Sequence, residues 1–312
     1  MLPAMHLDPS PAIRTRGLTR LFPGGQGVRE LDLDVPAGAI YGFLGPNGAG
    51  KTTGIRLLLG LLRADAGRVE LFGEPLDRQR RALRRVGALV ESPSLYRHLS
   101  GRDNLEVTRR LLGAPRARID AVLERVDLAS DAHRRVREYS LGMRQRLAIA
   151  LALLGEPGLL VLDEPSNGLD PAGIVELRKL LRGLAADGLT VFVSSHLLSE
   201  VELVASHVGV LQAGCLRFQG RLEELRGRVR PRLRLRAEPA LRAAELLTRL
   251  GETVHLELDG SLLLDARERE PAELNRLLVE HGIAVSALQA EQASLESLFF
   301  GLTVDAALER AA

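Results

Sequence analysis

Residues 45 to 52 read Gly45-Pro46-Asn47-Gly48-Ala49-Gly50-Lys51-Thr52, and a second threonine, Thr53, follows directly. This run matches the pattern G-x-x-x-x-G-K-[ST] at every fixed position. Glycines without a Cβ let backbone N–H groups curve around a phosphate, and the lysine can reach the terminal phosphates of a nucleotide. The run therefore predicts a loop that binds a nucleoside triphosphate, with the Thr52 hydroxyl placed to ligate Mg²⁺.

The sequence on both sides of this loop supports the same prediction. Residues 39 to 44 form a short apolar run that indicates a buried strand. Residues 54 to 62 are rich in leucine and favour a buried helix. A helix that begins at such a loop adds positive potential at its N-terminus, because its backbone dipoles align along the axis.

Composition places the chain among soluble globular proteins. Its 312 residues suffice for one large and one small domain or for two of middling size, and 46% of them are hydrophobic. No run approaches about 18 consecutive apolar residues, and the N-terminus lacks a basic region followed by an apolar core. With a single cysteine, Cys215, which fits a reducing compartment, we expect a cytoplasmic protein.

The charge pattern argues against a nucleic-acid partner. The formal net charge is +2, only 3% of the residues are aromatic and tryptophan is absent. Nucleic-acid binders usually concentrate basic charge and interleave aromatic side chains. The basic run over residues 78–85 could form a nucleic-acid patch, but we favour a solvated helix face.

Periodicity divides the chain into regions of different structure. Residues 12–76 alternate with period two in several places, including 31–35, which predicts strands, and residues 101–155 show helical spacing. Strands and helices alternate over residues 158–218, so this part predicts a parallel sheet with crossover helices, an α/β fold.

The pattern of predicted strands and helices changes beyond Gly220. The predicted order is β-α-β-β-α-β, with a hairpin signal at Asp259-Gly260 and a final short helix over 295–302. That order favours a small α+β unit of the ferredoxin-like type. We place the boundary near residue 226, with a nucleotide-binding domain over 1–226 and an accessory domain over 227–312.

Two carboxylates follow the apolar strand predicted at residues 159–162. In a fold with a phosphate-binding loop, an aspartate at such a strand end, here Asp163, holds Mg²⁺. The adjacent Glu164 can then polarise an attacking water. The alternative is a pair of carboxylates that caps a turn, and the loop at 45–52 favours the metal and water roles.

At this point the residues resemble one family closely, the ATP-binding cassette ATPases. Residues 139–147 (Tyr-Ser-Leu-Gly-Met-Arg-Gln-Arg-Leu) look like the family's signature loop and the helix that it opens. Residues 166–171 are similar to the D-loop, and Ser194-Ser195-His196 fits the switch histidine. The motifs follow the family's order over residues 12–222. The resemblance implies a P-loop NTPase cassette: a RecA-like parallel-sheet core, an antiparallel β subdomain and a helical subdomain over about 92–156.

The resemblance also implies roles for single residues. Glu164 and His196 would be catalytic, and Phe22 would stack on adenine beside the loop residues 45–53, which would bind ATP. Leu141 stands where the family usually has glycine, and Met143 where it usually has glutamine. The signature would contact the nucleotide of an opposite cassette, so that ATP joins a head-to-tail dimer. The residues implied in that interface are Ser140, Leu141, Gly142 and Met143 of the signature and Asp170 of the D-loop.

One departure from the family's pattern is informative. Glu91 stands where most members carry a glutamine whose side chain reaches Mg²⁺. With Thr52 and Asp163 it completes the implied metal ligands, because a carboxylate binds Mg²⁺ at least as well as an amide oxygen does. A glutamate here is typical of the bacitracin-resistance and lantibiotic-immunity exporters. Residues 294–299 resemble the end of the appendage found in cassettes that pair with six-helix permeases.

The resemblance therefore implies the ATPase subunit of a bacterial exporter of drugs or antimicrobial peptides. Its substrate is ATP with Mg²⁺, and its partners would be a separately encoded membrane permease and a second cassette, identical or paired. It would lie on the cytoplasmic face of the membrane. Two alternatives stay open: a cassette ATPase that acts on ribosomes or nucleic acid, and a regulator whose C-terminal unit binds a small ligand.

Overall fold

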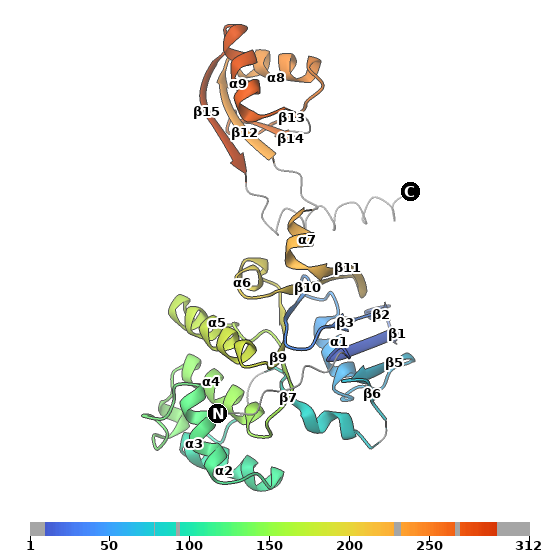
Figure 1. Ribbon diagram of the computed structural model, residues 1–312, viewed down its shortest axis with the longest axis vertical. Helices are drawn as coiled ribbons and strands as arrows, with labels where there is room; N and C mark the ends of the chain where they lie inside the picture. The colour runs from blue at the N-terminus through green and yellow to red at the C-terminus, as the bar shows by residue number, and fades with distance from the viewer. Residues whose placement is uncertain (1–9, 78, 92–93, 228–231, 266–268, 292–312) are drawn as a thin grey trace. The chain divides into compact units, whose positions relative to one another are not determined.

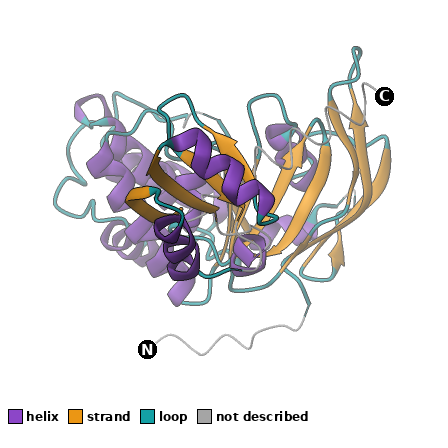
Figure 2. Cartoon of the chain, turned by 90° about the horizontal axis from the view of Figure 1, so that it is seen from above, coloured by secondary structure: helices purple, strands orange, loops and turns teal. Residues whose placement is uncertain are grey.

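The computed structural model describes residues 10–77, 79–91, 94–227, 232–265 and 269–291 (Figure 1). The chain divides into two compact units, Met1–Leu222 and Glu223–Ala312. The assignment of residues 1–226 and 227–312 to a nucleotide-binding and an accessory domain stays a prediction. Helices and strands both contribute to the structure (Figure 2), which confirms the α/β class.

The first unit is built on a six-stranded sheet with the order β11-β10-β4-β9-β8-β7. All neighbouring pairs are parallel except the edge pair β10–β11, which is antiparallel. Every residue of β4, β8 and β9 is buried, as expected for strands covered on both faces. The bounds are β4 Ile40–Leu44, β7 Val86–Leu89, β8 Leu159–Leu162, β9 Thr190–Ser195, β10 His207–Gln212 and β11 Cys215–Arg221.

The second sheet of this unit is antiparallel, which confirms the strands expected over residues 12–76. Its members are β1 Ile13–Leu21, β2 Gly27–Leu31, β3 Asp34–Val35, β5 Ala66–Leu71 and β6 Glu74–Pro75. One strand predicted over 31–35 is wrong, because the structure interrupts it. The buried Thr15 hydroxyl donates to Leu31 O (2.6 Å) and accepts from Leu33 N (2.8 Å), so a side chain replaces the ladder there.

The helices of this unit include one after the glycine-rich loop, at Lys51–Leu58 instead of the expected 54–62, and three within the expected helical region 101–155. The helical region is capped well: Ser100 accepts from Asp103 N at the start of α2, and Gly113 follows its end. Of the run at 78–85, Arg81–Arg85 form a short 3-10 helix, with Arg81, Arg84 and Arg85 exposed to solvent. The bounds are α1 Lys51–Leu58, α2 Gly101–Leu112, α3 Ala117–Arg125, α4 Leu141–Leu153, α5 Pro171–Ala186 and α6 Leu198–Glu202. A further helix, α7 Leu222–Gly227, starts at the last residue of this unit and continues into the second.

The core of the first unit lies where α1 meets both sheets. Ile55 of α1, Phe43 of β4 and Leu31 of β2 are fully buried in one hydrophobic cluster. The Phe192 ring of β9 stacks on the Tyr41 ring of β4, with centroids 5.4 Å apart. This packing fixes the end of β4 and the start of α1, the two elements that flank the loop at 45–50.

The second unit has a separate core and a four-stranded antiparallel sheet. Its strand order is β13-β14-β12-β15, and the chain order β12-α8-β13-β14-α9-β15 confirms the ferredoxin-like prediction. The helix predicted over 295–302 lies outside the described residues. The bounds are β12 Arg232–Glu238, α8 Ala240–Arg249, β13 Thr253–Leu256, β14 Leu262–Asp265, α9 Pro271–Glu280 and β15 Ala284–Glu291.

Within the described residues, no helix combines the length and the apolar character that crossing a bilayer requires.

Candidate nucleotide-binding site

The glycine-rich loop connects the buried end of β4 to the first turn of α1. Gly50 precedes the helix with a φ of 104°, and a Cβ built there would lie 2.6 Å from Gly27 O. A Cβ on Gly45 would lie 2.5 Å from Leu211 O. Because backbone atoms leave no room at either place, only glycine lets the loop take this path.

The Lys51 side chain is buried at the centre of the site. Its ammonium group donates to Gly45 O (2.7 Å) and Pro46 O (3.3 Å), and it lies 3.0 Å from Glu164 Oε1. Only 6% of the side chain is exposed. A buried ammonium needs such partners, since desolvation of an unpaired charge is costly. The structure thus joins the glycine-rich loop to the carboxylate that follows β8.

Asp163 is held on both of its carboxylate oxygens. The Thr52 hydroxyl donates to Oδ2 (2.9 Å), and the Ser194 hydroxyl donates to Oδ1 (2.6 Å). Ser194 Oγ also accepts from Glu164 N (2.9 Å). Since β8 and β9 are parallel neighbours, their carboxyl ends bring these side chains together at one edge of the sheet.

Glu164 has an unusual backbone and two basic neighbours. Its φ is 48°, in the left-handed region that few residues other than glycine adopt. His196 Nδ1 lies 2.8 Å from Glu164 Oε2. Burial alone would raise the pKa of Glu164, but hydrogen bonds and charges from His196 and Lys51 together lower it below its usual value. Glu164 is therefore a carboxylate at neutral pH.

A cavity of about 290 Å³ opens over this cluster. Phe22 and Glu164 both line it, and the Phe22 ring lies 5.3 Å from the Arg20 guanidinium carbon. Of the residues predicted to bind ATP, residues 46–53 and Phe22 line it, while Gly45 takes part through its carbonyl. Gln26, Gly27 and Asn167 also line the cavity and were not expected from the sequence.

The donor set of Thr52 and Asp163 fits Mg²⁺. A hydroxyl and a carboxylate oxygen lie side by side at 2.9 Å, and Mg²⁺ prefers few protein oxygens together with phosphates and water. Among the described residues no group of three or more His, Cys, Asp and Glu side chains gathers to hold a metal without a nucleotide. The third expected ligand is placed differently: Glu91 forms an ion pair with Arg56 of α1, and its role at the metal stays a prediction.

The signature residues lie outside this cavity. Ser140 caps α4 by accepting a hydrogen bond from Met143 N (3.2 Å), and Leu141 is exposed beside it. Asp170 caps α5 by accepting from Gly173 N (2.9 Å). The predicted roles of Ser140, Leu141, Gly142, Met143 and Asp170 toward a nucleotide on a second cassette stay predictions.

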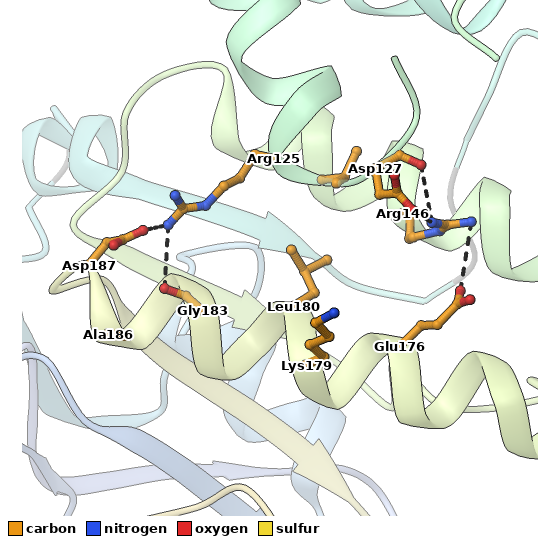
Figure 3. A pocket seen from close by; sticks show the side chains of 10 residues that line it. Arg125, Asp127, Arg146, Glu176, Lys179, Leu180, Gly183, Ala186 and Asp187 are labelled. Carbon is orange, nitrogen blue, oxygen red and sulfur yellow. Dashed lines mark hydrogen bonds and ion pairs between the residues drawn. The ribbon is translucent and has the colours of Figure 1, made fainter. Parts of the chain in front are cut away.

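A larger cavity, of about 660 Å³, separates α3 and α4 from α5 (Figure 3). Two arginines bridge it: Arg125 pairs with Asp187, and Arg146 lies 3.8 Å from Glu176. Arg125 also donates to Gly183 O (3.4 Å). Among the described residues no glycine-rich loop lines the cavity, and its acidic side chains already pair with its arginines. This geometry suits a connection between helices better than a binding site for an anion. We call these contacts the cleft ion pairs.

The sequence did not reveal what Ser194 contacts. It lies in the run that ends at His196, but its own hydrogen bonds to Asp163 and Glu164 depend on the register of β8 with β9. One sequence signal could have indicated this role: a hydroxyl residue at the end of the strand that comes next along the chain after the strand preceding Asp163 and Glu164.

Comparison with known proteins gives one consistent family. The sequence model of the ABC transporter family matches residues 28–167. The chain is 41% identical to a bacitracin transport ATP-binding protein of Bacillus licheniformis, over 94% of this chain and 97% of that one. It is 40% identical to a daunorubicin resistance ATP-binding protein of Streptomyces coeruleorubidus, over 94% and 96%. The solved structure of CbiO1 of Clostridium perfringens, part of an ABC transporter complex, matches 78% of this chain and 98% of its own length with a TM-score of 0.66 at 26% identity.

Proposed function

This chain belongs to the ATP-binding cassette (ABC) transporter family and is an ATPase, and from that premise we propose that it drives a bacterial exporter of antimicrobial peptides or other drugs. The observation that carries the proposal is the contact of Lys51 with Glu164 beside the Thr52–Asp163 pair. It joins a phosphate-binding group, a metal-binding pair and a base in one site. The relatives named for bacitracin and daunorubicin match almost the whole chain, including its second unit.

ATP binding is the first task of this site. The phosphates would take the place that Glu164 now holds beside Lys51, and backbone N–H groups among residues 47–50 would donate to them. Phe22 on the cavity wall offers an apolar face on which adenine can stack. Lys51 then acts as a cation that contacts the terminal phosphates.

Hydrolysis needs a group that accepts a proton from water. Glu164 is the candidate base, because it is ionised and its Oε2 lies 2.8 Å from His196 Nδ1, which orients it. When phosphate draws Lys51 away, one of the two contacts that lower the Glu164 pKa is lost, so the carboxylate becomes more basic when substrate is present. The second ring nitrogen of His196 remains to contact the γ-phosphate.

Thr52 and Asp163 would hold Mg²⁺, with Glu91 as a third oxygen ligand once it leaves Arg56. Bound there, Mg²⁺ would neutralise part of the phosphate charge that develops during hydrolysis. Asp163 keeps the Thr52 hydroxyl aimed at this position through their hydrogen bond.

The partners follow from the same proposal. The exposed N-terminus of α4, with Ser140 and Gly142, would complete the site of a second cassette, in a homodimer or with a paired cassette. A separately encoded permease would supply the membrane-spanning pathway, and this chain would lie on its cytoplasmic face. One relative is named as a transport ATP-binding protein and the other as a drug-resistance ATP-binding protein, so neither supports an ATPase that acts on ribosomes or nucleic acid.

The proposal is tested in cells that carry the chain together with its permease. Cells that express both should survive a higher concentration of a peptide antibiotic or an anthracycline than cells that carry the permease with the Glu164→Gln variant. The purified chain should hydrolyse ATP in the presence of Mg²⁺. Equal drug sensitivity of the two strains across both compound classes would refute export of drugs. Absence of ATPase activity in the purified wild-type chain would refute the assignment of the site.

A further inference from the structure

Ser194 is a fully buried hydroxyl at the end of β9, and both of its hydrogen bonds go to the acidic residues that follow β8. It donates its proton to Asp163 Oδ1 (2.6 Å) and accepts from Glu164 N (2.9 Å). A serine hydroxyl has one proton to donate, and here that proton is committed to the carboxylate. On the β9 side, both contacts are made by the Ser194 side chain.

The first contact fixes the plane of the Asp163 carboxylate. Since Oδ1 faces Ser194, Oδ2 must face Thr52, whose hydroxyl lies 2.9 Å away. The Asp163 main chain is held independently, because its N–H donates to Leu89 O (2.9 Å). Ser194 therefore controls the rotation of the side chain rather than the position of the strand.

The second contact holds a backbone that would not adopt this shape readily. β8 ends at Leu162, and Glu164 has a φ of 48°. Left-handed backbone is unfavourable for a residue with a Cβ. With the strand ladder ended, the Glu164 N–H is satisfied by the Ser194 hydroxyl, and this bond helps to direct the Glu164 side chain toward Lys51 and His196.

We propose that Ser194 is a positioning residue for ATP hydrolysis. Its hydroxyl orients two groups at the same time, Asp163 for binding Mg²⁺ and Glu164 for activating the attacking water. This inference rests on the proposed function, and it assigns to one hydroxyl the alignment of two groups with different tasks. The neighbouring Ser195 differs: its hydroxyl accepts from Leu197 N (2.9 Å) and shapes the following turn, with neither carboxylate as a partner in its hydrogen bonds.

The test compares Ser194→Ala with Thr190→Val, which removes a buried hydroxyl at the other end of the same strand. Thr190 Oγ1 accepts from Gly38 N (2.9 Å), far along β9 from the acidic residues. Thr190→Val removes one part-buried hydrogen bond and should lower the melting temperature by about 2–4 °C, whereas Ser194→Ala removes two, one of them to a carboxylate, and should lower it further. Only Ser194→Ala should lower kcat, by about tenfold or more, with the Kd for metal-free ATP within about threefold of the wild type.

Two further readouts separate positioning from a general loss of structure. Ser194→Ala should reduce the gain in ATP affinity that Mg²⁺ gives in calorimetry, and Ser194→Thr, which keeps the hydroxyl on a strand, should restore it. Without nucleotide, hydrogen exchange of the Glu164 amide should become faster in Ser194→Ala and stay unchanged in Thr190→Val. The exchange experiment tests the contact between Ser194 and the Glu164 amide without any turnover, so a wild-type chain that does not hydrolyse ATP would refute the proposed function while this contact could still be measured. Wild-type kcat together with unchanged exchange at Glu164 in Ser194→Ala would overturn the inference.

Discussion

Two parts of the first unit hold similar charged groups in opposite surroundings. At the ends of β8 and β9, Lys51 and Glu164 face each other with 6% and 17% of their side chains exposed. Across the cleft between α3 and α5, Arg125 and Asp187 pair with 39% and 48% exposed. An exposed pair contributes about 0–1 kcal/mol, whereas a buried one loses several kcal/mol of hydration per ion before any attraction is counted.

The degree of burial indicates the role of each pair. A buried pair is a poor way to stabilise a fold, so the Lys51–Glu164 contact is explained by the phosphate and the water that these residues are proposed to meet. The cleft ion pairs join two groups of helices at little cost, because water still solvates them (Figure 3). Substitutions should therefore have large functional effects at the first place and small structural effects at the second.

Lys51→Ala should give the largest effect. The phosphates lose their only side-chain cation from the loop, and Glu164 loses its charged neighbour. Charge-assisted contacts contribute roughly 1.5–3 kcal/mol each, so ATP affinity should fall by at least about tenfold, and hydrolysis should become undetectable. Calorimetry with ATP measures this, and Arg125→Ala serves as the control that removes an exposed cation. Equal affinity of Lys51→Ala and the wild type would remove the functional explanation of the buried pair.

Glu164→Gln should separate binding from turnover. The amide keeps the size of the side chain but cannot accept a proton, so hydrolysis should fall by about 10²-fold or more. ATP affinity should rise, because Lys51 no longer has a carboxylate that competes with phosphate. Single-turnover assays and calorimetry on the same preparation give both values. If hydrolysis persists while affinity falls, Glu164 serves structure and the base lies elsewhere.

Glu91→Gln tests a residue that belongs to the predicted metal site but is exposed to solvent, as the cleft ion pairs are. Glu91 is 60% exposed and pairs with Arg56. ATPase activity should stay within roughly tenfold of the wild type, because an amide oxygen can still reach Mg²⁺. Drug resistance in cells should fall further than hydrolysis does. A loss of hydrolysis as deep as that of Glu164→Gln would place Glu91 among the catalytic groups.

Acid should weaken the buried pair in a defined direction. Burial opposes ionisation of Glu164, yet His196 and Lys51 bring its pKa below the usual 4.5. The unfolded chain then takes up this proton at a higher pH than the folded chain does, so the contribution to stability is complete above about pH 4.5 and is lost as the pH falls through the folded pKa. Urea unfolding at decreasing pH should show the free-energy difference between the wild type and Glu164→Gln shrinking below that value. A difference that grows on acidification would contradict the assigned contacts.

Arg125→Ala should give the smallest effect. Its partners are Asp187 and Gly183 O, all at a solvated edge of the cleft. The free energy of unfolding should change by less than about 1 kcal/mol, and added salt should remove most of the change. Urea unfolding at low and high salt measures it, with ATPase activity as a second reading. A loss of several kcal/mol would show that the cleft ion pairs resemble the buried pair after all.

A structural feature could be predicted from the sequence when it is local, that is, when residues close together along the chain form it. The loop at 45–52, the strand before it and the helix after it form from neighbouring residues, and the structure has all three close to the predicted positions. The order of strands and helices in the second unit was predictable for the same reason, because alternation and the hairpin signal at Asp259-Gly260 are short-range patterns.

Features that join distant segments were not predictable in this way. Nothing near Ser194 in the sequence identifies Asp163 as its partner, since the register of two parallel strands decides that contact. The break between β2 and β3 depends on Thr15, which lies on another strand. The pairing of Glu91 with Arg56 likewise brings together the ends of β7 and α1. Each of these contacts arises only when the sheet is assembled.

The position of β4 in its sheet has a consequence for how the chain is made. β4 ends at Leu44, but its neighbours in the sheet are β9, which begins at Thr190, and β10, which begins at His207. A ribosome needs on the order of ten seconds to synthesise the residues between them. During that time the nascent chain carries a complete glycine-rich loop beside an apolar strand with no partner on either side. A chaperone that shields this strand during translation would therefore protect the segment that later forms the nucleotide site, at a stage when the rest of that site has not yet been synthesised.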